Sequence, residues 1–357
     1  MESSAFEIVI YLAWRIGFGS IIFAVLLFVV VFAMRRYLNN KAKRAIAFRE
    51  VWEPIMLASL DRIPDDLPPI EEKDHITYLI IWNYFQELLL DESKRNLQIL
   101  ANLTDLDLIA KRILRKRNIK GRLLAVNTLG WLKDKDSWNL LKKLLNHTDT
   151  TFSLAVARAL IQINPRKSTW LILPLIAKRK DWSIERCADL IKQMGVEEVA
   201  DKLILQINRT PKHLLPKMIR FLDLLLPSET NPVIRRMLTK YEDKEISYAC
   251  LLAYKDVDNL QRIRFFLTHE DWEIRMQAAI CLGKYGSEDD IDFLISTTED
   301  SEWWVRYRSA QALARIPEMS LEYLKVIADH HSNKFSRDVI LRIVTEREVA
   351  ESCGLSY

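Results

Sequence analysis

Cysteine and glycine are scarce in this sequence, and the short motifs that mark common catalytic sites are missing. Its 357 residues include eight glycines and four cysteines, Cys187, Cys250, Cys281 and Cys353, with no C-x-x-C pair. A glycine-rich phosphate loop, G-x-S-x-G and H-E-x-x-H are all absent. We therefore expect a protein that is not an enzyme, without catalytic residues, cofactor or metal. The cysteines are expected to be small buried side chains in a reducing compartment.

Excess charge of either sign is also missing from most of the chain. The net charge is +4, and residues 1–50 account for it with seven basic and three acidic side chains. The remaining residues are neutral overall, so they have no general field that would attract nucleic acid. Strands are not expected either, because the apolar residues recur three and four apart rather than alternating.

One long uncharged run stands near the start of the chain. Residues 16–34, IGFGSIIFAVLLFVVVFAM, would cross the ~30 Å hydrocarbon layer at about 1.5 Å per residue. The run is too long for a cleaved signal peptide, and basic residues follow it. This pattern predicts a single-pass anchor in the inner (cytoplasmic) membrane, with the N-terminus outside and the rest of the chain in the cytoplasm. The predicted membrane-interface residues are Arg15, Arg35, Arg36, Lys41, Lys43 and Arg44.

A basic amphipathic segment follows the run. In Asn40–Leu60, one helical face carries the residues Phe48, Val51, Trp52, Ile55 and Ser59. Two interpretations stay open: this face rests on anionic head groups, or the segment extends the membrane helix and packs on the first repeat. The acidic, proline-rich segment Asp61–Asp74 is the predicted boundary between stalk and repeats.

Beyond this boundary, large aliphatic residues recur at intervals of 30 or 31. They are Leu129, Leu160, Ile191, Leu222, Leu252, Leu282 and Leu313. Three residues before each, on the same helical face, stand Val126, Ala157, Ala188, Ile219, Ala249, Ala279 and Ala310. Such a period is typical of stacked helical hairpins that share one core. The predicted fold is therefore all-α, an α-solenoid of hairpins preceded by one transmembrane helix.

The most regular part of this pattern resembles the HEAT-repeat family. The residues that carry the resemblance are Ile274-Arg275, Ala278-Ala279, Leu282-Gly283, Val305-Arg306, Ala310 and Leu313. The repeat is similar to the short form of about thirty residues that also occurs in phycobilisome lyases. The resemblance implies that an acidic residue in each inter-repeat turn pairs with the arginine of the following helix, so that Asp271 pairs with Arg275 and Glu302 with Arg306. It covers residues 121–333, and only the apolar spacing survives over 214–244.

These patterns divide the chain into five segments. We predict an anchor over 1–38, a juxtamembrane helix and linker over 39–74, capping helices over 75–120, repeats over 121–350 and a tail over 351–357. The capping helices are expected at His75–Leu90 and Ser93–Arg117. The last repeat is expected to be incomplete, with Leu341 and Val344 one period beyond Ala310 and Leu313.

Two groups of residues are candidate partner-binding sites. One lies in Lys111–Arg122, where seven of twelve residues are basic: it is either a solvated helix end, or a patch facing the anionic membrane surface or an acidic partner. The other is three tryptophans near the starts of first helices, which are either packing wedges or a ridge of indoles. The candidates are Lys111, Arg112, Arg115, Lys116, Arg117, Trp182, Trp272 and Trp303.

The predicted function is a membrane-anchored scaffold whose repeats bind a protein partner. We expect this partner to be an integral membrane protein, and we expect no nucleic acid and no small-molecule substrate. HEAT proteins with one anchor resemble accessory subunits of bacterial envelope assemblies, such as a glycosyltransferase complex that makes an exopolysaccharide. Two alternatives remain: a bilin lyase-like or other tetrapyrrole-handling protein, and a solenoid that binds nucleic acid through residues 111–122.

Overall fold

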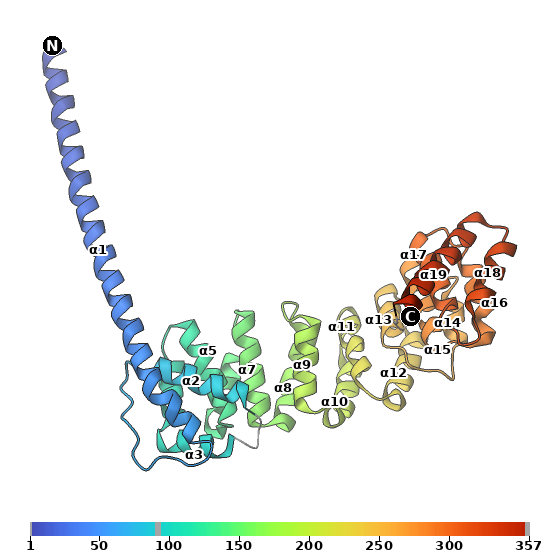
Figure 1. Cartoon of the computed structure of the whole chain (residues 1–357), viewed down its shortest axis with the longest axis horizontal. Helices are drawn as coiled ribbons and strands as arrows, with labels where there is room; N and C mark the ends of the chain where they lie inside the picture. Colours follow the sequence, from blue (N-terminus) through green and yellow to red (C-terminus); the bar gives the residue numbers. More distant parts are fainter. Residues whose placement is uncertain (1, 90–93, 354–357) are drawn as a thin grey trace. The chain divides into compact units, whose positions relative to one another are not determined.

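The computed structural model describes residues 2–89 and 94–353, and every regular element in these ranges is a helix (Figure 1). The chain forms two compact units, residues 1–159 and 160–357. The first unit contains α1 Glu2–Ala58, α2 His75–Leu88, α3 Arg95–Leu103, α4 Leu106–Leu114, α5 Ile119–Trp131, α6 Trp138–Leu144 and the start of α7 Thr150–Ile163. The all-α prediction is confirmed.

The second unit is a series of helical hairpins. Its helices are α8 Pro165–Lys178, α9 Ile184–Met194, α10 Val196–Arg209, α11 Leu215–Ile219, α12 Pro227–Lys240, α13 Lys244–Leu252, α14 Gln261–Phe266, α15 Trp272–Tyr285, α16 Ile291–Thr297, α17 Trp303–Leu313, α18 Leu321–His330 and α19 Lys334–Ser352. Short 3₁₀ turns, η2 Lys135–Ser137, η3 Lys212–Leu214, η4 Arg220–Leu224 and η5 Glu288–Asp290, occur between some helices of the two units. Within this unit α13, α15, α17 and α19 pack in that order, each on the next. This stacking is the solenoid arrangement that the period predicts.

The repeating apolar residues form the core between these helices. Six of the seven large aliphatic positions are fully buried, as are six of the seven positions three residues earlier. Leu252 and Ala188 are half-buried instead. Leu252 is the last residue of α13, so it lacks a following turn to cover it. The spacing therefore predicts the core stripe correctly.

Two repeats depart from the pattern. Near residue 220 the first helix is reduced to α11 and the 3₁₀ turn η4, because Leu226 precedes Pro227 and must be extended. In α19 the predicted Leu341 is wrong: its side chain is 38% exposed, whereas Ile340 and Ile343 are fully buried. Val344, the other predicted residue, is 3% exposed and belongs to the core as predicted. The predicted tail also begins later, because α19 continues to Ser352 and residues 354–357 lie outside the described residues.

The predicted helix Ser93–Arg117 is wrong as a single element. It consists of α3 and α4, separated at Asp105, whose φ of 49° is left-handed and cannot continue a helix. The predicted ends at Leu90 and Ser93 lie outside the described residues. In α2, Trp82 and Phe85 belong to the core of the first unit, as α2 supplies its apolar face to α5.

Helix α1 runs without interruption through residues 38 and 39. By length and composition its portion from Gly17 can cross a membrane, and none of its apolar window is covered by the described protein. Its end packs on α2: Trp52 and Met56 are buried, and the Trp52 and Tyr78 rings lie 4.9 Å apart. This packing agrees with the second interpretation of the Asn40–Leu60 segment. Val51, predicted on the packed face, is 49% exposed.

This junction predicts a large effect of Trp52→Ala on the first unit. Removing a fully buried indole should lower the free energy of unfolding by about 3–5 kcal/mol, since the cavity cannot refill completely. Thermal unfolding of the detergent-solubilised full chain measures this loss of stability. Leu57→Ala, at an exposed position on the same helix, is the control and should leave the unfolding temperature unchanged. Equal effects of both changes would contradict the packing of α1 on α2.

Candidate partner-binding surfaces

A ladder of ion pairs connects the turns of successive repeats in the second unit. Arg275 lies in α15, and its Nε and Nη2 are 2.6 and 2.8 Å from the two carboxylate oxygens of Asp300, in the turn between α16 and α17. Asp271, the predicted partner of Arg275, instead lies 2.8 Å from Lys244 Nζ. The predicted direction of the ladder is therefore wrong: each basic residue reaches forward to the next turn, because the following helix is stacked beside its own.

The guanidinium groups of Arg275 and Arg306 also bind the turn that precedes their own helix. Arg275 Nη1 donates to the carbonyls of His269 and Glu270, at 2.7 and 2.9 Å. Arg306 repeats this pattern with Asp300 and Ser301, and the described residues contain no ion pair between Arg306 and Glu302. One arginine thus satisfies carbonyls that a turn would leave unpaired.

Asp300 is more enclosed than Asp271, the acid that Lys244 binds in the preceding inter-repeat turn: 10% of its side chain is exposed, against 30%. Burial by itself would raise the pKa of its carboxyl, but hydrogen bonds from Arg275 and from the backbone N–H of Glu302 hold that pKa below its ordinary value. The group therefore remains a carboxylate, and its role is to join two repeats.

A groove runs along the first helices of three successive repeats, α9, α11 with η4, and α13. Two adjoining cavities of about 610 and 420 Å³ form it. Both are lined by Ile184, Glu185, Arg220 and Leu252. The lining combines apolar side chains with charges of both signs, which suits a polypeptide better than an apolar ligand.

Trp182 lines the larger of these two cavities but belongs to the core. Its side chain is 1% exposed, so the prediction that it offers an indole to a partner is wrong. Trp182 precedes Ser183, the N-cap of α9, whereas Trp272 and Trp303 are the first residues of their helices. This shift of position turns Trp182 inward, where it acts as a packing wedge. Trp272 is half-buried, so the three indoles do not form a ridge.

Trp303 belongs to an exposed aromatic cluster on α17 and α19. We define the aromatic cluster as Trp303, Trp304, Tyr307 and Arg342. The Trp303 and Tyr307 rings stack at 5.1 Å, and Trp304 meets Trp303 edge-on at 4.6 Å. Arg342 Cζ lies 5.6 Å from the Trp303 and Tyr307 rings, and Glu346 accepts hydrogen bonds from Arg342 and from Tyr307.

The tryptophans of the aromatic cluster remain accessible although their neighbours hold them in place. Trp303 is 40% exposed and Trp304 is 49% exposed. Exposed aromatic side chains with fixed rotamers and a stacked arginine are the residue types that dominate the energy of protein interfaces. Sequence reasoning identified only Trp303. The W-W-x-x-Y spacing could have indicated Trp304 and Tyr307, but Arg342 comes from the next repeat.

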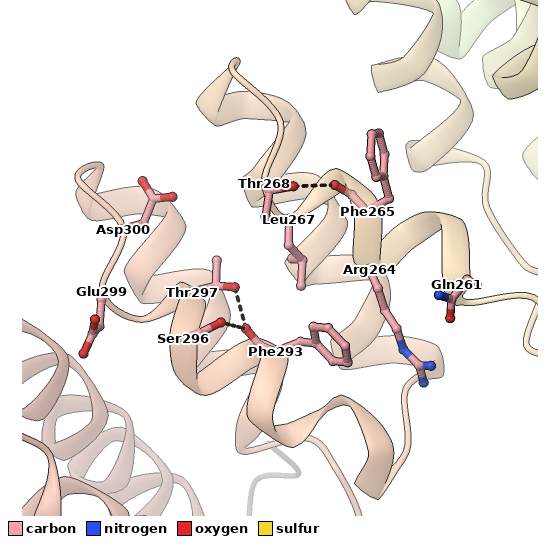
Figure 2. A pocket seen from close by; sticks show the side chains of 10 residues that line it. All are labelled: Gln261, Arg264, Phe265, Leu267, Thr268, Phe293, Ser296, Thr297, Glu299 and Asp300. Carbon is pink, nitrogen blue, oxygen red and sulfur yellow. Dashed lines mark hydrogen bonds between the residues drawn. The ribbon is translucent and has the colours of Figure 1, made fainter.

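A further pocket of about 490 Å³ lies between α14 and α16, the second helices of two repeats (Figure 2). Phe265 and Phe293 line it, and 68% of the Phe265 side chain is exposed. The hydroxyl of Thr268 donates to the carbonyl of Phe265, and those of Ser296 and Thr297 donate to the carbonyl of Phe293, as the dashed lines in Figure 2 mark. Gln261, Arg264, Glu299 and Asp300 also line the pocket, so it is mixed in character, with two exposed aromatic rings beside charged side chains. Sequence reasoning missed both phenylalanines.

The predicted basic residues of the first unit divide into two sets. Lys111 is largely buried between Asp107 and Asp134, at 3.0 and 2.9 Å, so it is not available to a partner and its prediction is wrong. Arg44 is also occupied: it donates to both carboxylate oxygens of Asp74, at 2.8 and 2.7 Å, and lies 2.9 Å from Glu71. Arg44 is nevertheless exposed, as are the other predicted basic residues, of which Lys116 lies 2.9 Å from Glu72; these others are Arg15, Arg35, Arg36, Lys41, Lys43, Arg112, Arg115, Lys116 and Arg117.

The cysteines of the repeats are packing residues. Cys187, Cys250 and Cys281 are buried, and burial raises the pKa of Cys250 and of Cys281 to about 12. Their thiols therefore stay protonated and unreactive at neutral pH. Over residues 2–89 and 94–353, no three His, Cys, Asp or Glu side chains are grouped as metal ligands would be.

Residues 247–314 match the family model of HEAT repeats. This range runs from α13 to the end of α17, and it contains Arg275, Asp300 and the pocket of Figure 2. HEAT repeats are helical repeats that mediate protein–protein interactions through their extended surfaces. No curated protein matches the sequence.

Proposed function

We propose that this protein is a membrane-tethered scaffold that binds a protein partner through the aromatic cluster and does not act as an enzyme. The observation that carries the proposal is the exposure of Trp303 and Trp304 at the end of a HEAT-repeat array. Two large indoles held by neighbours yet open to solvent lose little conformational freedom on binding, so their burial yields affinity efficiently.

The apolar part of α1 supports the tether. Its large side chains between Phe18 and Met34 are about half exposed or more, and nothing in the described protein covers them. Such a surface is stable in hydrocarbon and costly in water. With basic residues following the run, we place the N-terminus outside and the repeats in the cytoplasm.

We infer that the partner is an integral membrane protein. A tether confines the repeats to the layer beside the bilayer, so it raises the effective concentration of proteins in the same membrane without adding contacts. A cytosolic partner would gain nothing from it. Membership of an envelope polysaccharide assembly stays a prediction, as do the tetrapyrrole and nucleic-acid alternatives.

The proposal predicts that Trp304→Ala weakens capture of the partner. A central exposed indole in an interface is worth at least about 2 kcal/mol, so affinity should fall roughly 30-fold. The full chain is cross-linked in membranes, solubilised and affinity-purified, and the cross-linked partner is quantified by mass spectrometry. Trp170→Ala, at an exposed tryptophan on α8, is the matched control and should retain the partner. Loss with both variants, or with neither, would contradict a role for the aromatic cluster.

A further inference from the structure

Helix α1 gives a scale for distance from the bilayer. Arg44 follows Met34, the last residue of the apolar run, by ten positions, which is about 15 Å along a helix. Arg44 is bound to Asp74 and Glu71. The hydrogen bonds from Arg44 hold the pKa of Asp74 below its ordinary value, against the effect of burial. This ion pair therefore persists at neutral pH. It places residues 71–74 beside Arg44, and so about 15 Å along α1 from the end of the apolar run.

The turn between α4 and α5 lies beside the same segment. Lys116 Nζ is 2.9 Å from Glu72 Oε1. A Cβ atom at Gly121, near the start of α5, would lie 3.1 Å from Ile76 in the first turn of α2. Two independent contacts thus hold this turn next to residues 72–76. It lies in the same unit as α1 and near the level of Arg44.

This turn has the composition of a membrane-contacting surface. We define the basic turn as Arg112, Arg115, Lys116, Arg117 and Lys120, all of them exposed. Ile119 stands among them with 40% of its side chain exposed. Apart from the Lys116–Glu72 pair, no carboxylate of the described residues lies within 4 Å of these cations.

We propose that the basic turn binds anionic lipid head groups of the bilayer that α1 crosses. This inference rests on the proposed membrane tether. The head groups add about 5–8 Å to each side of the hydrocarbon layer, and charges attract over a Debye length of about 8 Å. At about 15 Å from the apolar run, extended arginine and lysine side chains come within this range of the head groups, and Ile119 lies among them on the same exposed surface. The exposed cations of α1, Arg35, Arg36, Lys41 and Lys43, extend the same surface.

Anionic lipid is favoured over nucleic acid or an acidic protein as the ligand because the basic turn lies near the bilayer. The contacts that place the turn near the bilayer belong to the folded chain and exist without any partner. Docking also has a structural consequence: with α1 inserted and the basic turn on head groups, the first unit has two points of attachment. Its orientation to the membrane would then be set.

The test uses the full chain in nanodiscs of phosphatidylcholine, with or without phosphatidylglycerol. Ile119→Cys in a Cys353→Ser background carries a fluorophore, and a spin label on the lipid head group quenches it; the three remaining cysteines are buried. We expect at least about fivefold more quenching with phosphatidylglycerol, and loss of the difference near 1 M salt, where the Debye length is about 3 Å. Arg115→Glu, Arg117→Glu and Lys120→Glu together should abolish the difference.

The matched control is Lys135→Glu, Lys142→Glu and Lys143→Glu, which makes the same charge change at exposed positions of the first unit. It should keep the phosphatidylglycerol effect. Equal quenching in both lipids, or equal loss in both triple variants, overturns the inference while the tether stands. A chain that does not enter nanodiscs overturns the tether and the inference together. Retention of RNA or of an acidic protein by the basic turn, without a lipid effect, assigns it to that ligand instead.

Discussion

Replacing Gly283 with valine is expected to destabilise the second unit by at least about 3 kcal/mol. Gly283 lies in α15, where a Cβ atom would come within 2.8 Å of both Cα and Cβ of Ala312 in α17. The Cα atom of Ala312 belongs to the backbone, which cannot move away as the end of a flexible side chain can. The two helices would have to separate, and the core between successive repeats would open with them.

Chemical denaturation of the full chain, followed by tryptophan fluorescence, measures this loss. The matched control is Lys284→Val, which introduces the same β-branched residue at the next position of α15, where the side chain is exposed. It should lower the unfolding free energy only by the difference in helix propensity, well under 1 kcal/mol. If Gly283→Val behaved like the control, α15 and α17 could not approach as closely as the structure has them.

Arg275→Met is expected to cost about 3 kcal/mol for a different reason. The substitution keeps much of the side-chain volume but leaves the largely buried carboxylate of Asp300 without its partner, together with the carbonyls of His269 and Glu270. Arg166→Met is the control, since Arg166 joins Glu198 in an exposed pair of α8 and α10. Surface pairs contribute little, so the control should leave the unfolding midpoint unchanged. Similar losses in the two variants would contradict the special role of the Arg275–Asp300 link.

The pH dependence of stability gives a second measure of the Arg275–Asp300 ion pair. The pKa of Asp300 is lowered in the folded state, so its contribution to stability is complete above the unfolded value of about 4 and disappears as pH falls through the folded value. The unfolding free energy should therefore fall more steeply below about pH 4 in the wild type than in Arg275→Met. Parallel acid profiles would show that Asp300 does not carry this dependence.

Periodicity was sufficient to predict the repeats because burial follows helix geometry. An aliphatic residue that recurs at 30 or 31 positions, with a small residue one turn earlier, can be placed only on a shared face. The prediction failed at Leu341, because the preceding residue, Ile340, takes the buried position, although Val344 is buried as predicted. It also failed at Asp105, where a left-handed residue splits one predicted helix, since no strong breaker such as glycine or proline stands there.

The candidate surfaces were less predictable because they combine residues from different repeats. Trp182 and Trp303 follow the same local pattern, yet one is a core residue and the other an exposed anchor. Their difference depends on whether the residue precedes the N-cap or starts the helix. Folding brings distant carboxylates to two of the predicted cations, Asp74 to Arg44 and Asp134 to Lys111. Only the contact of Lys111 with Asp107, four residues earlier on the same helix, could have been read from the sequence.

The sequence by itself determined that this protein is a helical repeat array preceded by one long apolar helix. Those features depend on local composition and on regular spacing, because helix geometry places regularly spaced residues on one face. Only the tertiary structure decided which charges pair, which tryptophans remain accessible, and that the turn after α4 lies beside residues 72–76. Ion pairing, exposure and the position of the turn all depend on which residues from other helices surround a side chain. Those neighbours are fixed only when the helices pack together.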